Sequence, residues 1–248
     1  MKHFDESVRN SALSAFHSAV SWSRSPASGI SVAAITDNFT FDVSDLSTAL
    51  SVGERKKASA IADPNEKRHY VFKRCFQRMF VKTVLNWMGP LDGLEIEHQL
   101  DRPPNCPHAP DLQLSFSSSG FSAVACASRT RAVGIDVEHH RAIENVGALA
   151  RRFFTPTEAE MITELPPADQ NLAFLRLWTA KEAGLKAIGR GIVSGLNSLV
   201  LSSEGYRYNF EIVEEFKMST AWSCIHLTFM PHHIVTVVHS PEKSLHIP

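Results

Sequence analysis

The sequence of 248 residues predicts an α+β protein built on antiparallel sheet. Segments with strand and helix patterns follow one another without a regular strand–helix–strand repeat, which argues against a parallel sheet. The clearest strand signal is the apolar–polar alternation that begins at Leu112, and the clearest helix signal is the apolar periodicity around Trp178. A hydrophobic content of 44% is ordinary for a globular protein, and the chain is long enough to bury a core without disulfides.

The first third of the chain predicts one strand and two helices. Ile30–Ile35 is a short apolar strand candidate, and residues 50–62 have a helical pattern that ends at the breaker Asp63-Pro64-Asn65. Residues 66–85 predict a second helix with one apolar side.

A basic stripe runs along this second helix, because Arg74, Arg78 and Lys82 recur at four-residue spacing. Such a stripe is most often a face exposed to solvent. The sharper interpretation is a contact to phosphate or a docking face for an acidic partner.

Three strands are predicted in the middle of the chain. Leu112, Leu114 and Phe116 face one way, and the polar residues between them face the other way. A turn at Ser118-Ser119-Gly120 leads to a strand over residues 121–127, and a turn at residues 128–131 leads to a third strand over residues 132–138. Three strands joined by short turns predict a β-meander.

The rest of the chain predicts helices followed by strands. A helix over residues 141–154 precedes Thr155-Pro156-Thr157-Glu158, a helix start with Thr at the N-cap, Pro at N1 and Glu at N3. The central helix follows Pro166-Pro167 and ends at Gly189 and Gly191. Four strands complete the chain, over residues 196–202, 207–214, 222–229 and 233–239.

Two carboxylates are predicted to share one face of the strand over residues 132–138. Gly134, Asp136 and Glu138 alternate with three apolar residues that suit a core. Like charges this close repel unless a cation lies between them. Oxygen-only ligands suit Mg²⁺, and the glycine would leave room for a phosphate. The alternative is an acidic strand end that faces solvent.

A third carboxylate and a lysine lie one turn apart on the central helix. Glu182 and Lys186 share a helix face, and on spacing alone they indicate a surface salt bridge. Together with Asp136 and Glu138 they favour a phosphoryl-transfer site. A metal would hold a diphosphate, Lys186 would neutralise charge on the leaving side, and a carboxylate would position the nucleophile.

A family resemblance rests on the two motifs that carry these side chains. They are Val133-Gly134-Ile135-Asp136-Val137-Glu138 and Trp178-x-x-Lys181-Glu182-Ala183-x-x-Lys186-Ala187-x-Gly189-x-Gly191. The pair resembles the signature of the 4′-phosphopantetheinyl transferases, with the spacing of the larger, surfactin-synthetase-activating type. The Phe153-Phe154-Thr155-x-x-Glu158 stretch between them also fits. Two looser matches lie upstream. Asp101-Arg102-Pro103 stands where the family has Gly-Lys-Pro, and residues 114–120 stand where it has Phe-Asn-Ile-Ser-His-Ser-Gly.

The resemblance implies two pseudo-symmetric halves, each a small antiparallel sheet packed with helices. The halves would be residues 1–130 and residues 131–248, with the metal site in the second half and the active site at the interface. The implied activity is that of a holo-acyl-carrier-protein synthase. It would transfer the 4′-phosphopantetheine arm of coenzyme A to a serine of an apo acyl or peptidyl carrier protein and release adenosine 3′,5′-bisphosphate. Mg²⁺, or Mn²⁺ in its place, would be required.

The resemblance also implies a role for particular residues. Asp136, Glu138 and Glu182 would hold the metal. Glu182 would help to deprotonate the carrier serine, and Lys186 would stabilise the charge of the pyrophosphate. Coenzyme A would be bound by Lys186 together with residues near its adenine and 3′-phosphate: Lys57, Arg102, Ser117 and Ser118.

The sequence departs from the family pattern at two positions. Ser118 stands where the family has a histidine linked to the 3′-phosphate, and a serine can donate a hydrogen bond but supplies no positive charge. Asp101 stands where the family has the glycine of Gly-Lys-Pro, so a carboxylate lies near an anion site. We expect weaker discrimination against dephospho-coenzyme A. Since neither change touches the three carboxylates, we expect the chemistry to survive.

Two other functions stay open on the sequence alone. One is a catalytically impaired module that binds coenzyme A or a carrier protein, which the departures at Ser118 and Asp101 favour. The other is a different Mg²⁺-dependent enzyme that cleaves pyrophosphate. If the protein is instead an active transferase, carrier proteins of fatty-acid, polyketide and nonribosomal-peptide synthesis fit it equally well as substrates.

Composition and charge indicate which kinds of partner and which cellular compartment to expect. A net charge of −1 gives no overall attraction to nucleic acid or to an anionic membrane. The four cysteines form no CxxC pair, the N-terminus has no apolar signal region, and no apolar run approaches the ~20 residues of a membrane helix. We therefore expect a cytoplasmic protein, and two halves in one chain would allow a monomer to hold a complete site.

Overall fold

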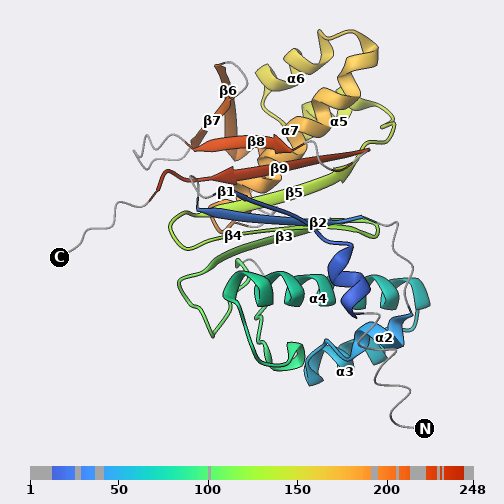
Figure 1. Cartoon of the computed structure of the whole chain (residues 1–248). Helices are drawn as coiled ribbons and strands as arrows, with labels where there is room; N and C mark the ends of the chain where they lie inside the picture. The colour runs from blue at the N-terminus through green and yellow to red at the C-terminus, as the bar shows by residue number, and fades with distance from the viewer. Residues whose placement is uncertain are drawn as a thin grey trace, which may run out of the picture.

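A computed structural model of the chain describes residues 13–25, 29–36, 42–99, 102–190, 195–204, 207–212, 222–227, 230 and 232–242. It confirms the α+β class, because two antiparallel sheets are packed with helices (Figure 1). No helix in these ranges is both long and apolar enough to cross a membrane. Asp101 and Gly191 lie outside the described residues.

Within the described ranges, the first sheet has four strands and the second has five. In spatial order, the first sheet contains β1 (Ser21–Ser25), β2 (Ile30–Ile35), β4 (Ser122–Ser128) and β3 (Gln113–Ser119). The second contains β5 (Val133–His139), β9 (His233–His239), β8 (Ser223–Leu227), β7 (Arg207–Ile212) and β6 (Leu199–Glu204). All neighbouring strands are antiparallel. Strand β1 was not predicted from its polar sequence.

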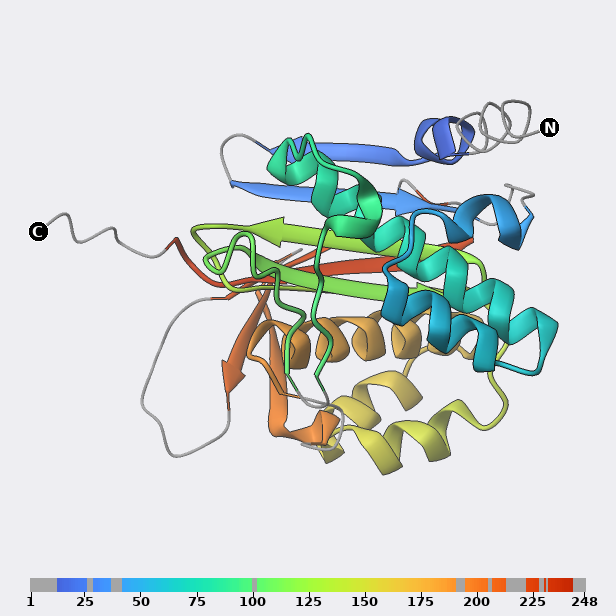
Figure 2. The same ribbon diagram turned by 90° about the horizontal axis from the view of Figure 1, so that it is seen from below.

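Helices cover the outer sides of the two stacked sheets (Figures 1 and 2). The first sheet is flanked by α2 (Val43–Ser47), α3 (Val52–Ala60), α4 (Pro64–Leu85) and the short 3₁₀ turn η1 (Leu91–Gly93). The second is flanked by α5 (Val146–Phe153), α6 (Pro156–Thr163), α7 (Pro167–Ala187) and the 3₁₀ turn η3 (Leu196–Ser198). The predicted capping box of Thr155 and Glu158 is confirmed at the start of α6.

The two sheets meet through a small apolar core. Val133, Ile135 and Val137 of β5 pack in one buried cluster with residues of β2 and β4, including Val32 and Val124. The predicted faces of β5 are therefore confirmed: its valines and isoleucine face the first sheet. Gly134, Asp136 and Glu138 lie on the opposite side of the pleat.

The predicted meander is wrong at its third strand. Strands β3 and β4 form a hairpin, but β5 pairs along its whole length with β9, from Val133↔His239 to His139↔His233. The reason is that β4 is already hydrogen-bonded to β2 on one edge and to β3 on the other, so it has no edge left for β5. The chain therefore leaves the first sheet after β4 and begins the second.

The basic stripe of α4 is not a docking face, because its middle residue is buried. Only 2% of Arg78 is exposed, and its guanidinium donates to the Glu54 carboxylate at 2.7 Å and to the Leu91 carbonyl at 2.6 Å. Lys82 donates to the Gly89 carbonyl at 3.4 Å. Arg78 thus joins α3 and η1 to α4 and is shielded from solvent.

The central helix ends where the glycine pattern predicted. Helix α7 stops at Ala187, and Gly189 takes the left-handed conformation with φ of +72°, which suits a residue without a side chain. One side of α7 packs on α5 and α6 through Leu175 and Leu185. Its other side carries Ala180, Ala183 and Ala187, whose small side chains let it lie close to the second sheet.

Gly134 fixes the distance between β5 and α7. A Cβ atom built on Gly134 would lie 1.9 Å from the Ala183 carbonyl oxygen and 2.6 Å from the Ala187 nitrogen. The space that we expected for a phosphate is therefore filled by the backbone of α7. Both atoms belong to the main chain, so they cannot turn away as a side chain could.

Gly134→Ala is expected to force α7 away from β5 and to lower the free energy of unfolding by about 3 kcal/mol, the upper range for overpacking a core. Urea denaturation of the two proteins measures this change. Gly53→Ala is the matched control, because a Cβ atom at that position meets nothing within 4 Å. Equal losses in both variants would contradict the role of Gly134.

Candidate active site

The close packing of α7 on β5 brings the two sequence motifs together. Asp136 and Glu138 come from the face of β5 that Gly134 opens to α7, and Glu182 and Lys186 come from the facing turns of the helix. Lys186 Nζ donates to the Asp136 Oδ1 atom at 2.6 Å and to the Ile135 carbonyl at 3.3 Å. The ion pair of Lys186 thus joins helix to strand, whereas spacing alone had indicated a pair with Glu182 on the helix surface.

Asp136 is a buried carboxylate with only one of its oxygens in use. Only 3% of the residue is exposed. Its Oδ1 atom accepts hydrogen bonds from Lys186 and, at 2.7 Å, from the Ser117 hydroxyl of the first sheet. Its Oδ2 atom is buried without a hydrogen-bond partner in the described part of the chain. An unpaired buried carboxylate oxygen is costly, and it is the kind of atom that a bound cation would satisfy.

The negative charge of Asp136 acts on the pKa values of both Glu138 and Glu182. Burial and the Asp136 carboxylate both raise the pKa of Glu138. Burial raises the pKa of Glu182 to about 7; Asp136 and Glu138 add to that rise, and Lys186 opposes it. The three acids therefore share one electrostatic environment, where a positive charge would favour their ionised forms.

The donor set fits a hard divalent cation that is also held by its substrate. Among the described residues, no group of three or more His, Cys, Asp or Glu side chains is arranged as a ready-made metal cage. Mg²⁺ does not need such a cage, since it is usually bound by one or two carboxylates together with substrate phosphates and water. The unpaired Oδ2 atom of Asp136 and the raised pKa values of its acidic neighbours agree with that mode.

A pocket adjoins Lys186. It has a volume of about 230 Å³ and lies between the segment at Arg102-Pro103-Pro104, strand β3 and the end of α7. Arg102 and Lys186 both line it, together with Arg190 just beyond the helix. Three basic side chains from two separate segments make this pocket suitable for an anion.

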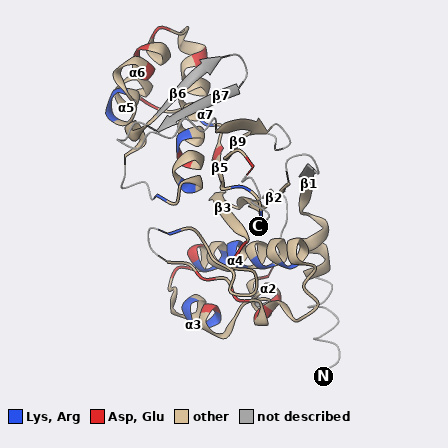
Figure 3. Cartoon of the chain, turned by 90° about the vertical axis from the view of Figure 1, so that its left-hand side faces the viewer, with Lys and Arg blue, Asp and Glu red and all other residues tan. Residues whose placement is uncertain are grey.

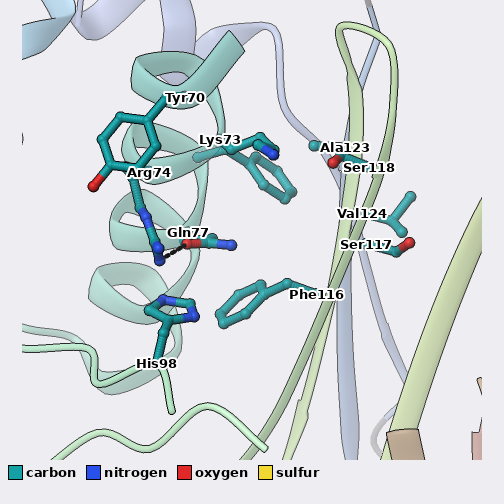
Figure 4. Close-up of a pocket in the computed structure, with 11 residues that line it drawn as sticks. Tyr70, Lys73, Arg74, Gln77, His98, Phe116, Ser117, Ser118, Ala123 and Val124 are labelled. Atoms are coloured by element: carbon teal, nitrogen blue, oxygen red, sulfur yellow. Dashed lines mark hydrogen bonds between the residues drawn. The ribbon is translucent and has the colours of Figure 1, made fainter. Parts of the chain in front are cut away.

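A second pocket lies between α4 and β3 (Figure 4). Its volume is about 180 Å³, and Phe116 lines both this pocket and the one beside Lys186. Ser118 lies in its wall opposite Lys73 and Arg74, which project from α4. Burial lowers the pKa of Lys73, as does the neighbouring Arg74. Arg74 is partly engaged, since it donates to the Gln77 side chain at 3.0 Å.

Lys57 is not among the residues that line either pocket. It is exposed on α3, and its positive charge acts on His98 of the second pocket. His98 lines that pocket, and burial together with the charges of Arg74 and Lys57 lowers the pKa of His98 to about 4. The imidazole is therefore neutral near pH 7. Figure 3 shows charged residues along α3, α4 and α7, the helices that border the stacked sheets.

Lys181, the neighbour of Glu182, anchors the central helix from behind. Its side chain is fully buried, and its Nζ atom donates to the Glu158 carboxylate at 2.6 Å and to the Leu199 carbonyl at 2.6 Å. Successive residues lie about 100° apart around a helix, so Lys181 points toward α6 and β6 while Glu182 points toward β5. The pair Lys181–Glu158 thus fixes the rotation of α7 that presents Glu182.

Lys181→Met is expected to lower the free energy of unfolding by about 3–5 kcal/mol, because it leaves the buried Glu158 carboxylate without its cation. Urea denaturation provides the measurement. The double variant Lys181→Met with Glu158→Gln removes both charges and should recover part of that loss. A single-variant loss below about 1 kcal/mol, the value of an exposed ion pair, would contradict the assignment.

Three groups near the candidate site were missed from the sequence. Lys73 shares one face of α4 with Tyr70, Arg74 and Gln77, and the structure shows that this face meets β3. Helical spacing groups these four residues in the sequence, but it does not indicate that their face borders a pocket. His98 and Arg190 lie in or beside loops, where spacing carries no information about neighbours in space.

The chain was compared with known proteins. A family model described as the 4′-phosphopantetheinyl transferase superfamily matches residues 132–238. Over 159 residues, 60% of this chain and 70% of the relative, the chain is 31% identical to a 4′-phosphopantetheinyl transferase of Bacillus subtilis. It is 42% identical to the 4′-phosphopantetheinyl transferase HetI of Nostoc sp. over 81 residues, which are 33% of this chain and 34% of HetI.

A further relative is the 4′-phosphopantetheinyl transferase Sfp of Bacillus subtilis strain 168. Identity is 30% over 122 residues, which are 48% of this chain and 53% of Sfp. The chain thus covers less than two thirds of HetI and of Sfp, and more than two thirds of the first Bacillus protein.

Proposed function

The chain belongs to the 4′-phosphopantetheinyl transferase superfamily, and we propose that it transfers the 4′-phosphopantetheine arm of coenzyme A to a serine of an apo carrier protein. Adenosine 3′,5′-bisphosphate is the second product. The observation that carries this proposal is the group around Asp136: a buried carboxylate held by Lys186, with one oxygen free and two further acids nearby.

The proposal assigns the metal to Asp136, Glu138 and Glu182. Mg²⁺ bound there would neutralise negative charge on the diphosphate and so make its cleavage easier. The acids hold the ion through oxygen ligands, the type that Mg²⁺ prefers. A cation also removes the repulsion that otherwise raises the pKa values of Glu138 and Glu182.

Lys186 and Glu182 are the proposed catalytic residues. The side chain of Lys186 is 29% exposed and lines the pocket with Arg102, so its ammonium group can donate to the diphosphate as negative charge develops on the leaving side. Glu182 lies one turn away. We propose that its carboxylate helps to accept the proton of the carrier serine, directly or through a water molecule.

The proposal places the adenine and 3′-phosphate end of coenzyme A toward Arg102, Ser118 and Lys57. Ser118 supplies no positive charge where the family has a histidine. Lys73 lies in the same pocket as Ser118, and in the described part of the chain it has no ion-pair partner. Lys73 therefore supplies the charge that Ser118 lacks, which predicts better discrimination against dephospho-coenzyme A than the sequence alone indicated.

Intact-mass spectrometry of apo carrier proteins tests the transfer directly. Incubation with this protein, coenzyme A and Mg²⁺ is expected to add one phosphopantetheine to a carrier, and EDTA should abolish the gain. Asp136→Asn keeps the shape of the side chain but removes its charge, so transfer should fall by about 1,000-fold or more while the protein stays folded.

The control for that variant is Asp111→Asn, an exposed residue whose ion pair with Arg129 lies on the surface. It should transfer at the wild-type rate. Transfer by Asp136→Asn at that same rate would contradict the metal assignment. Binding of coenzyme A without transfer would favour an impaired module, and release of adenosine bisphosphate without any carrier would favour a pyrophosphate-cleaving enzyme.

Lys73→Met tests the compensation for Ser118. Steady-state kinetics are expected to show an increase of about 10-fold in KM for coenzyme A and little change for dephospho-coenzyme A, which lacks the phosphate that Lys73 would contact. Lys67→Met, on a face of α4 that lines a different groove, is the control. Equal changes for the two substrates would refute this role of Lys73.

Other parts of the account stay predictions. These are the division into halves at residue 130, the holo-acyl-carrier-protein synthase subtype, the monomeric state and the cytoplasmic location. Size-exclusion chromatography with light scattering measures the oligomeric state.

A further inference from the structure

Three serines lie along one side of β3 where it runs beside β5. Ser115, Ser117 and Ser119 are two residues apart, so their side chains share one face of the strand. Strands β3 and β5 are edge strands of different sheets, and in the described residues neither is the other's ladder partner. The serine side chains therefore form the polar part of the joint between the sheets.

Each serine makes one hydrogen bond across this joint. The Ile135 amide donates to Ser115 Oγ at 3.1 Å, and the His139 amide donates to Ser119 Oγ at 3.3 Å. These two bonds satisfy backbone groups on the outer edge of β5, which has no strand there to pair with. Ser117 differs from both, because its hydroxyl donates at 2.7 Å to a side chain of the candidate site, Asp136 Oδ1.

The bond from Ser117 determines which oxygen of Asp136 is free. Ser117 and Lys186 both donate to Oδ1, and Oδ2 is left buried without a partner. Lys186 has three hydrogens and is also proposed to donate to the diphosphate, whereas the single hydrogen of Ser117 is directed to Oδ1 alone. A carboxylate with one oxygen held and the other free presents a fixed ligand atom to a cation.

We propose that Ser117 is a positioning residue for the reaction: its hydroxyl holds the Asp136 carboxylate so that Oδ2 binds the divalent ion. The inference rests on the proposed function, and it replaces the role that the resemblance implied for Ser117. A serine hydroxyl has one hydrogen to donate. Because that hydrogen is directed to Asp136, it cannot also be donated to the 3′-phosphate of coenzyme A.

Ser117 also links the contact between the two sheets to the proposed metal site. Ser117 comes from the first sheet and Asp136 from the second, so the metal ligand of one sheet is oriented by the other. Ser117 and the next residue of β3, Ser118, both line the pocket between α4 and β3. Of these two serines, Ser117 is the one that donates to Asp136, so it connects that pocket to the proposed metal ligand.

The test is a titration of Mn²⁺ into the protein saturated with coenzyme A, with free Mn²⁺ followed by electron paramagnetic resonance. Ser117→Ala is expected to raise the Kd for Mn²⁺ about 10-fold or more, as losses of hydrogen bonds to metal ligands do. The KM for coenzyme A should change little. Ser119→Ala is the matched control, because it removes a bond across the same joint without touching Asp136.

A second pair of variants separates orientation from folding. Ser117→Thr and Ser117→Val have nearly the same shape, but only threonine keeps the hydroxyl. Threonine should bind Mn²⁺ within about 2-fold of wild type, and valine should bind as weakly as alanine. This comparison holds even where Ser117→Ala lowers the melting temperature.

Two results would overturn the inference while leaving the proposed function intact. One is wild-type affinity for Mn²⁺ in both Ser117→Ala and Ser117→Val. The other is a raised KM for coenzyme A with unchanged Mn²⁺ affinity, which would show that the hydroxyl serves the nucleotide. A wild-type protein that neither binds Mn²⁺ nor modifies a carrier would instead refute the proposed function, and this inference with it.

Discussion

The approach of α7 to β5 at Gly134 is the contact on which the rest of the site depends. Gly134 has no side chain, so the backbone of α7 can lie very close to it. A Cβ atom at this position would be only 1.9 Å from the Ala183 oxygen. Lys186 can then pair with Asp136, and burial of Glu182 beside Asp136 and Glu138 raises its pKa. The small side chains Ala180, Ala183 and Ala187 maintain the same close packing along the helix.

The charges at this contact are balanced only in part. Lys186 pairs with Asp136, while Arg141 and Lys186 act on Glu138 from a distance, and one buried oxygen of Asp136 has no partner in the described part of the chain. A surplus of negative charge is unfavourable in a buried site unless a ligand compensates it. We infer that packing around the site offsets the cost of this excess negative charge. The buried Lys181–Glu158 pair on the opposite side of α7 is part of that packing.

Local patterns in the sequence predicted most of the elements and the shared face of Asp136 and Glu138. They failed where an outcome depends on partners distant in sequence. The alternation over residues 132–138 specified a strand but could not specify β9 as its neighbour. Four-residue spacing placed Arg78 on a stripe, but its burial depends on Glu54 and on the loop carbonyl of Leu91. Likewise, no local signal in β3 pairs Ser117 with Asp136.

We propose that the free oxygen of Asp136 and its acidic neighbours Glu138 and Glu182 hold the ion that binds the diphosphate. Anomalous diffraction from crystals grown with Mn²⁺ and coenzyme A is the sharpest measurement of that role. We expect an anomalous peak in contact with Asp136 Oδ2, Glu138, Glu182 and a coenzyme A phosphate oxygen. A peak at any other position, or coenzyme A bound with its diphosphate away from Asp136 and Lys186, would contradict it.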